Sequence, residues 1–389
     1  MGKKDSKKKR AVKKGRMSDC SSRDSVDMSV LPRIDVLSDV PCFDEMICTE
    51  RQREVFESFR AKHEAPQEVH LGCVVRLDRG YPLIATAEDV FRAEHAVNFA
   101  KGRRDEGHVL PAIGDWVAVR RAPGNDMGMI LNVLPRHSVF ERWRGKSRGE
   151  RQVLAANVDR VLIVQALGAE RDSLSLMCDR VARSMVLARD CGAMPIVLLT
   201  KADRCVADEL DVVVDTLGRL VGPEVGVVVT SSRTGLGMDA VRDCLPRGTF
   251  SMILGESGAG KSTLINMLLG HEALATNDVR ERDDAGRHTT VARVMVSLPD
   301  PCGVVADAPG LRSLPLVGHE RGLARAFPEV VEAARACRFN DCTHTHEPGC
   351  AVLEGVGQGD IEPVRVEAFL HLAQEMRVSA QSLDPDVHL

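Results

Sequence analysis

The sequence predicts an α/β domain built on parallel strands, placed between a five-stranded β-barrel and a small helical module that binds a metal ion. Three observations support this prediction. Short strand-like runs separated by turns fill residues 69–136, strand-like and helix-like stretches alternate from residue 157 onwards, and cysteines and histidines cluster between residues 337 and 350. A chain of 389 residues is also too long for one ordinary core, so two or three domains are expected.

The composition is that of a soluble globular protein. Hydrophobic residues make up 44% and charged residues 28% of the sequence, which is ordinary for folded domains. The apolar runs are too short to cross a bilayer, and the first residues lack the apolar core of a secretory signal. We therefore expect a cytoplasmic monomer with no membrane association, in which most of the 12 cysteines are reduced.

Residues 1–66 are expected to form a basic and largely disordered N-terminal extension. Residues 1–16 hold nine Lys or Arg against the single Asp5, although the whole chain carries a net charge of −4. A basic tail on an acidic body suggests an arm that binds polyanions. A disordered, solubilising tail is the alternative. Within the extension, Glu50–His63 has the pattern of a short charged helix.

A barrel domain is expected over residues 67–140. Its candidate strands are Val69–Leu77, Tyr81–Thr86, Val90–His95, Asp115–Arg120 and Met129–Val133. Turn signals such as Asp78-Arg79-Gly80 separate these strands. Five short strands in ~70 residues suit an OB-type barrel, a common platform for oligonucleotides. Because stacking aromatics are nearly absent, a small barrel with no nucleic-acid role is the alternative.

An α/β domain is expected over residues 150–315. The candidate strands are Arg160–Gln165, Pro195–Leu199, Val225–Thr230, Ser251–Leu254 and Gly303–Ala306, and the candidate helices are Ser173–Arg189, Ala207–Leu220 and Lys261–Leu269. Such alternation indicates a sheet of parallel strands. Ligand sites in these sheets lie at the carboxyl ends of the strands, and the motifs described below fall there.

A glycine-rich loop predicts a nucleotide site. The pattern G-x-x-x-x-G-K-[ST] is matched at every position by Gly255-Glu256-Ser257-Gly258-Ala259-Gly260-Lys261-Ser262, which is followed by Thr263. A strand precedes the loop and a helix follows it, and the glycines let backbone N–H groups face the phosphates. Lys261 is the expected catalytic charge near the β and γ phosphates, and the Ser262 hydroxyl suits a Mg²⁺ ligand.

Two motifs that precede this loop predict guanine as the base. Thr200-Lys201-Ala202-Asp203 resembles N-K-x-D with Thr in place of Asn. A carboxylate at Asp203 accepts hydrogen bonds from guanine N1–H and the 2-amino group, donors that adenine lacks. The usual Asn carboxamide braces the phosphate loop, and Thr200 lacks this group. Tight binding of the nucleotide is therefore in question, although the choice of guanine is not. Ser231-Ser232 resembles the motif whose backbone N–H meets guanine O6.

Two further segments predict contacts to Mg²⁺ and to the γ-phosphate. Asp307-Ala308-Pro309-Gly310 matches D-x-x-G, in which the Asp holds Mg²⁺ through water and the Gly N–H senses the γ-phosphate. In Gly286-Arg287-His288-Thr289-Thr290, either Thr289 or Thr290 is expected to complete the Mg²⁺ coordination.

Leu311 stands where a water-orienting Gln is often found, so hydrolysis should be slow unless another group places the water. A partner could do this, or a residue such as His288. A structural or partner-contacting role is the alternative for His288.

The order of the motifs indicates circular permutation, because the guanine motifs come before the phosphate loop. A site at strand ends depends on where the strands lie and not on chain order. The prediction is therefore a circularly permuted GTPase domain that binds GTP or GDP with Mg²⁺. Its D-x-x-G segment leads directly into the C-terminal module, and γ-phosphate contacts at Gly310 are expected to be transmitted there.

Residues 316–389 are expected to form a zinc-binding helical module. Three thiolates and one imidazole come from Cys337, Cys342, His344 and Cys350. This closed Cys₃His set suits one structural Zn²⁺, which would fold a segment too small for its own core. His346 is a competing imidazole with less apt spacing, and free cysteines in a loop are the alternative.

From Val69 to about Arg365 the sequence resembles the small ribosomal subunit biogenesis GTPase family RsgA, also known as YjeQ-type. Besides the permuted motifs, the resemblance rests on Gly114-Asp115, Pro135-Arg136, Ala156-Asn157-Val158-Asp159, Gly286–Thr290, Phe327-Pro328-Glu329, Cys337–His344 and Glu347–Cys350. Departures from the family pattern are Thr200, Ala308, Val291 and the long N-terminal extension.

The resemblance implies that the barrel, the GTPase domain and the zinc module act together on the small ribosomal subunit and its rRNA late in maturation. It also implies slow GTP hydrolysis that the subunit stimulates and that is coupled to release. Two other functions stay open: a phosphate-loop ATPase or small-molecule kinase, and a GTP-dependent RNA-binding assembly chaperone with little turnover.

Overall fold

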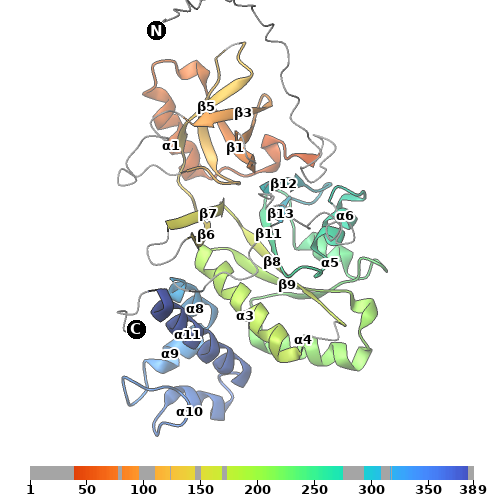
Figure 1. Ribbon diagram of the computed structural model, residues 1–389, viewed down its shortest axis with the longest axis vertical. Helices are drawn as coiled ribbons and strands as arrows, with labels where there is room; N and C mark the ends of the chain where they lie inside the picture. Colours follow the sequence, from red (N-terminus) through yellow and green to blue (C-terminus); the bar gives the residue numbers. More distant parts are fainter. Residues whose placement is uncertain are drawn as a thin grey trace, which may run out of the picture.

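The computed structural model describes residues 39–77, 81–95, 110–122, 124–144, 150–168, 173–274, 293–307, 316 and 318–383. A barrel, an α/β domain and a C-terminal group of helices follow one another along its long axis (Figure 1). Several predicted features lie outside the described residues. They are the basic tail at 1–16, His288, Thr289, Thr290, Gly310 and Leu311.

The predicted five-stranded barrel is confirmed. Its strands are β1 (Val69–Leu77), β2 (Leu83–Thr86), β3 (Val90–His95), β4 (Trp116–Arg120) and β5 (Met127–Val133). The strand order is β1-β2-β3-β5-β4, and β4 pairs again with β1 and closes the barrel. The pairing of β3 with β5 is parallel and the others are antiparallel. Fully buried residues such as Val74, Ile84 and Ile130 fill the interior.

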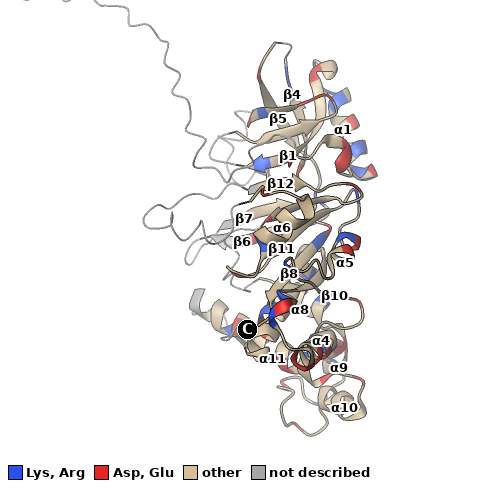
Figure 2. Cartoon of the chain, turned by 90° about the vertical axis from the view of Figure 1, so that its right-hand side faces the viewer, with Lys and Arg blue, Asp and Glu red and all other residues tan. Residues whose placement is uncertain are grey.

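The segment before the barrel is folded from residue 39 onwards, so the expected disorder does not hold for residues 39–66, and the charged helix predicted at Glu50–His63 is confirmed. The segment contains η3 (Phe43–Glu45), α1 (Glu50–Ala61) and η4 (Pro66–Glu68). Thr49 caps α1, because its hydroxyl accepts a hydrogen bond from Gln52 N and its own N–H donates to Gln52 Oε1. Phe56 of α1 is buried with Trp116 of β4 in one apolar cluster. Basic and acidic residues are interspersed along the exposed side of α1 (Figure 2).

The α/β domain has the predicted parallel sheet. Its strands are β8 (Arg160–Ala166), β9 (Met194–Thr200), β10 (Val227–Val229), β11 (Phe250–Leu254), β12 (Arg293–Ser297) and β13 (Val304–Asp307). The order is β10-β9-β8-β11-β13-β12, and every neighbouring pair is parallel except β12 with β13. Helices cover both faces: α3 (Leu174–Cys191) and α4 (Ala207–Val221) on one, α5 (Met238–Asp243) and α6 (Lys261–Leu269) on the other.

Three strands of the structure were not predicted. The hairpin of β6 (Val139–Arg144) and β7 (Glu150–Ala156) forms a separate two-stranded sheet between the barrel and the α/β domain. The third is β12, at the edge of the large sheet. It pairs with β1, which joins the sheet to the barrel.

A buried polar junction also holds the barrel against the α/β domain. The Asp115 carboxylate, which is fully buried, accepts two hydrogen bonds from Arg136, at 2.7 and 2.6 Å. Asn157 donates to Gly114 O at 2.8 Å and accepts from Gln52 Nε2 of α1 at 3.1 Å. A Cβ atom at Gly114 would lie 2.2 Å from Ala156 O, so the close approach requires glycine here.

The C-terminal helices pack on α3 and α4. They are α8 (Glu320–Ala326), α9 (Pro328–Ala334), α10 (Ala351–Gln358) and α11 (Pro363–Leu383). Gly322 allows α8 to lie directly on α3, since a Cβ atom there would be 2.4 Å from Val186 O. The buried Arg365 of α11 donates to Leu220 O of α4 at 2.6 Å and to Ala326 O at 2.8 Å. The main apolar core is continuous through these helices and the sheet.

Candidate active site and metal centre

The predicted nucleotide motifs meet at the carboxyl edge of the large sheet. β9 ends at Thr200, β10 leads to Ser231, β11 enters the phosphate loop and β13 ends at Asp307. These strands are parallel, so their carboxyl ends share one edge. The register places Asp307 opposite Ile253, just before the phosphate loop. Motifs that occur in the reverse of the usual chain order thus lie together at one edge of the sheet.

The phosphate loop has the backbone of an anion-binding turn. Gly258 and Gly260 have φ angles of +80° and +90°, a region that favours glycine. The Lys261 ammonium donates to the carbonyls of Gly255 and Glu256, both at 2.8 Å, which holds it over the loop. α6 begins at Lys261, so its free N–H groups lie where phosphates would bind. The residues therefore fit a di- or triphosphate. Ser262 is half-buried in the first turn and Thr263 is exposed.

The segment predicted to read the base, Thr200–Asp203, is bonded directly to this loop. The buried Thr200 hydroxyl lies 2.7 Å from Ala259 O and 3.2 Å from Gln165 O. The Lys201 ammonium donates to Gly258 O at 2.6 Å. The Thr200 hydroxyl thus braces the phosphate loop, although the usual Asn carboxamide is absent.

The Asp203 carboxylate is held by side chains of the β10–α5 loop. Ser231 Oγ donates to Asp203 Oδ1 at 2.5 Å, and Arg233 Nε lies 2.9 Å from Asp203 Oδ2. The Ser231 hydrogen bond lowers the pKa of Asp203 most, and a backbone hydrogen bond and the charge of Arg233 lower it further, which favours the ionised form that the predicted contact with guanine requires. Ala202 N donates to Thr230 O, which ties the two base-reading segments together. Ser232 is half-buried beside them.

The metal cluster predicted near the C-terminus is assembled. The ligand atoms of Cys337, Cys342, His344 and Cys350 all lie within 4.8 Å of one another. Cys337 Sγ is 3.9 Å from Cys350 Sγ, and His344 Nδ1 is 3.5 Å from both sulfurs. A tetrahedral zinc ion with ordinary bond lengths separates two sulfurs by about 3.8 Å and a sulfur and a nitrogen by about 3.6 Å. The four side chains therefore fit Zn²⁺.

The competing His346 takes part in the loop around this cluster instead. Its Nδ1 contacts the Thr345 hydroxyl at 2.8 Å. Glu347 accepts hydrogen bonds from the backbone N–H groups of Thr343, Thr345 and His346. These bonds, those from Thr343 above all, lower the pKa of Glu347 and hold the loop closed.

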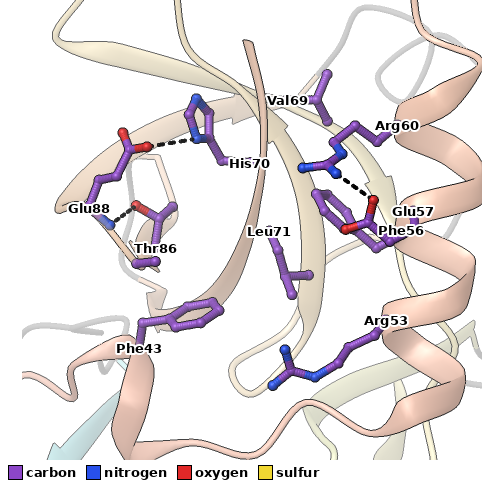
Figure 3. A pocket seen from close by; sticks show the side chains of 11 residues that line it. Phe43, Arg53, Phe56, Glu57, Arg60, Val69, His70, Leu71, Thr86 and Glu88 are labelled. Atoms are coloured by element: carbon purple, nitrogen blue, oxygen red, sulfur yellow. Dashed lines mark hydrogen bonds and ion pairs between the residues drawn. The ribbon is translucent and has the colours of Figure 1, made fainter. Parts of the chain in front are cut away.

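A separate cavity of about 370 Å³ lies between α1 and β1 of the barrel (Figure 3). Phe43, Phe56 and Leu71 line its apolar part. Among its polar residues, Arg60 pairs with Glu57 at 2.6 Å, His70 lies 3.6 Å from Glu88, and Arg53 donates a hydrogen bond to Cys48 O.

Together, the fold and the site define a circularly permuted, phosphate-loop GTPase with an N-terminal barrel. The RsgA GTPase family model matches residues 133–317. The small ribosomal subunit biogenesis GTPase RsgA of Streptomyces coelicolor is 40% identical over 310 residues, which cover 78% of this chain and 80% of that protein. The protein of the same name from Methanosarcina acetivorans is 37% identical, over 70% of this chain and 72% of its own length. The chain belongs to the RsgA GTPase family.

Solved structures agree with this fold. YjeQ from Thermotoga maritima aligns with a TM-score of 0.60 at 24% identity, over 79% of this chain and 99% of that one. YloQ, described as a circularly permuted GTPase, aligns with a TM-score of 0.56 at 19% identity, over 82% and 98% of the two chains. Within the part of the chain that the structure describes, no helix is long and apolar enough to span a membrane.

Proposed function

We propose that this chain is a GTPase that binds the small ribosomal subunit and its rRNA and assists late maturation, with slow hydrolysis that the subunit stimulates and that is coupled to release. The observation that supports this most is the bonding of the base-reading segment to the phosphate loop at Gly258 and Ala259. Relatives that cover most of the chain carry the name small ribosomal subunit biogenesis GTPase. We place the protein in the cytoplasm, as a monomer.

Each part of the site has a role in this proposal. Lys261 and the loop N–H groups bind the phosphates, and Asp203 reads guanine N1–H and the 2-amino group. The backbone at Ser231 and Ser232 meets guanine O6. Mg²⁺ would be held by Ser262, by Thr289 or Thr290, and through water by Asp307, and it would neutralise charge that develops on the phosphates. The zinc ion would be structural.

Turnover with and without purified small subunits tests the activity. We expect slow GTP hydrolysis by the chain alone, because Leu311 cannot orient water, and stimulation by at least about tenfold when small subunits are added. Lys261→Ala should abolish both rates and leave the circular dichroism spectrum unchanged. Binding of GTP without any stimulated turnover would instead favour the assembly chaperone.

The choice of nucleotide is tested by Asp203→Asn. Guanine then loses the acceptor for its two donors, so GDP affinity should fall by about a hundredfold or more. Xanthosine diphosphate, which has a carbonyl in place of the 2-amino group, should bind better to the variant than to the wild type. The measurement is a competition assay with ATP, GDP and xanthosine diphosphate. If the chain were an ATPase or a small-molecule kinase, Asp203→Asn would not change its preference from GDP to xanthosine diphosphate.

A further inference from the structure

We propose that Arg180 of α3 is a positioning residue of the nucleotide site, because it neutralises the Glu256 carboxylate of the phosphate loop. This inference rests on the proposed binding of guanine nucleotides and names a residue outside the sequence motifs. The distance between Arg180 Nη2 and Glu256 Oε2 is 3.0 Å.

Glu256 is an unfavourable residue for a loop that binds phosphates. It is the second residue of the phosphate loop, and its own carbonyl accepts a hydrogen bond from the Lys261 ammonium. Its backbone is therefore part of the site that receives the phosphates, and its carboxylate repels them unless a cation compensates it. The side chain is 49% exposed, so water screens the charge only in part.

Arg180 comes from a rigid element that is suited to this task. α3 starts at the Ser173 cap and packs Met177, Val181 and Met185 into the main core. The Arg180 side chain is only 22% exposed, which shields its contact with Glu256 more than an ordinary surface pair. The helix that carries the compensating charge is thus fixed by the core.

The same turn of α3 is also held by the C-terminal module. Asp179 Oδ1 lies 2.9 Å from His371 Nδ1 of α11, and Arg183 contacts Glu375 of the same helix. Arg180 lies between these two contacts in sequence. The docking of α11 therefore supports the turn that presents Arg180 to the phosphate loop.

A double-mutant cycle tests the proposal. GDP and guanosine affinities are measured by displacement of a fluorescent GDP analogue for the wild type, Arg180→Ala, Glu256→Gln and the double variant. Arg180→Ala should weaken GDP binding roughly tenfold at about 0.05 M salt and less at about 0.5 M, because salt screens the uncompensated carboxylate. Guanosine, which has no phosphate, should bind as to the wild type. The double variant should return to within about threefold of Glu256→Gln.

Arg189→Ala is the matched control, since it removes the same charge from the same helix at a residue that pairs with Glu224. It should leave GDP affinity unchanged. Equal losses of GDP and guanosine binding in Arg180→Ala would overturn the proposal, as would a double variant as weak as Arg180→Ala. Absence of GDP binding in the wild type would instead remove the proposed function together with this inference.

Discussion

At the scale of single residues, Thr200 shows how a shorter side chain can replace a motif residue. The hydroxyl reaches Ala259 O because β9 ends close to the loop, and a Cβ atom at Gly260 would be 3.5 Å from Thr200 Oγ1. A hydroxyl donates one hydrogen at a time. The bond to Ala259 O, at 2.7 Å, is therefore favoured over the longer one to Gln165 O, at 3.2 Å.

Thr200→Val keeps the shape of this side chain and removes its donor. We expect GDP affinity to fall roughly tenfold, or about 1–2 kcal/mol, because a buried carbonyl of the loop loses its partner. Thr200→Ser keeps the hydroxyl and should stay within about threefold of the wild type. Isothermal titration with GDP distinguishes the two variants, and equal affinities would show that the hydroxyl does not brace the loop.

The sequence motifs predicted the residues that converge on the site, since each motif carries its own chemistry at fixed spacing. Arg180 and Arg233 were missed because they belong to no motif and contact Glu256 and Asp203 only in the folded chain. His288, Thr289 and Thr290 lie outside the described residues, so their roles stay predictions.

At the scale of elements, the segment from Asp39 to Cys48 connects the α/β domain to the barrel. Glu45 accepts a hydrogen bond from the Ser297 hydroxyl at 2.6 Å, and Met46 forms a parallel bridge with Gly248. Phe43 packs on Trp116 of the barrel with an edge-on geometry and a centroid distance of 5.3 Å. The apolar residues of this segment gain their partners from two other parts of the chain, which the sequence alone does not show.

The unpredicted strands have a related cause. β6 and β7 carry charged residues along a two-stranded ribbon, so they lack the apolar alternation that marks a strand. β12 is short, with five residues. By contrast, the barrel strands and the parallel strands were predicted within about two residues, because most of them carry apolar residues that are buried in a core.

The contact between Asp39 and His271 should make this segment sensitive to pH. The hydrogen bond with Asp39 at 3.0 Å, and then the charge of Asp39, raise the pKa of His271. The pKa of His271 is therefore higher in the folded chain than the value of about 6.5 in the unfolded chain. The contact with Asp39 then stabilises the folded segment fully below about pH 6.5, and this stabilisation is lost as the pH rises through the folded pKa.

Protection of residues 39–48 from hydrogen exchange should therefore decrease between about pH 6 and about pH 8, after correction for intrinsic exchange. His271→Gln should remove this decrease and leave exchange of the barrel strands unaffected. A decrease of the same size in His271→Gln would assign the effect to another group.

At the scale of the whole molecule, the C-terminal module and the α/β domain share one core, and Arg365 is the buried charge within it. Besides its bonds to Leu220 O and Ala326 O, Arg365 donates to Glu329 at 2.9 Å. Its guanidinium also lies over the Phe327 ring, 5.1 Å from the centroid. One side chain thus joins α11, α9 and α4.

Arg365→Ala should lower the free energy of unfolding by about 2–4 kcal/mol, because two buried carbonyls lose their donor and the half-buried Glu329 loses its partner. The matched control is Arg335→Ala, whose exposed pair with Glu332 should contribute no more than about 0.5 kcal/mol. Chemical denaturation of both variants measures the difference. Equal effects would mean that water replaces the buried contacts without cost.

The position of β11 at the centre of the large sheet has a consequence for synthesis on the ribosome. A growing chain releases β8, β9 and β10 first, so the half that reads the base emerges before the strand that carries the phosphate loop. β11 then inserts between β8, already present, and β13, which follows it. A nascent chain can therefore bring the two predicted nucleotide motifs together only after the phosphate loop has left the exit tunnel.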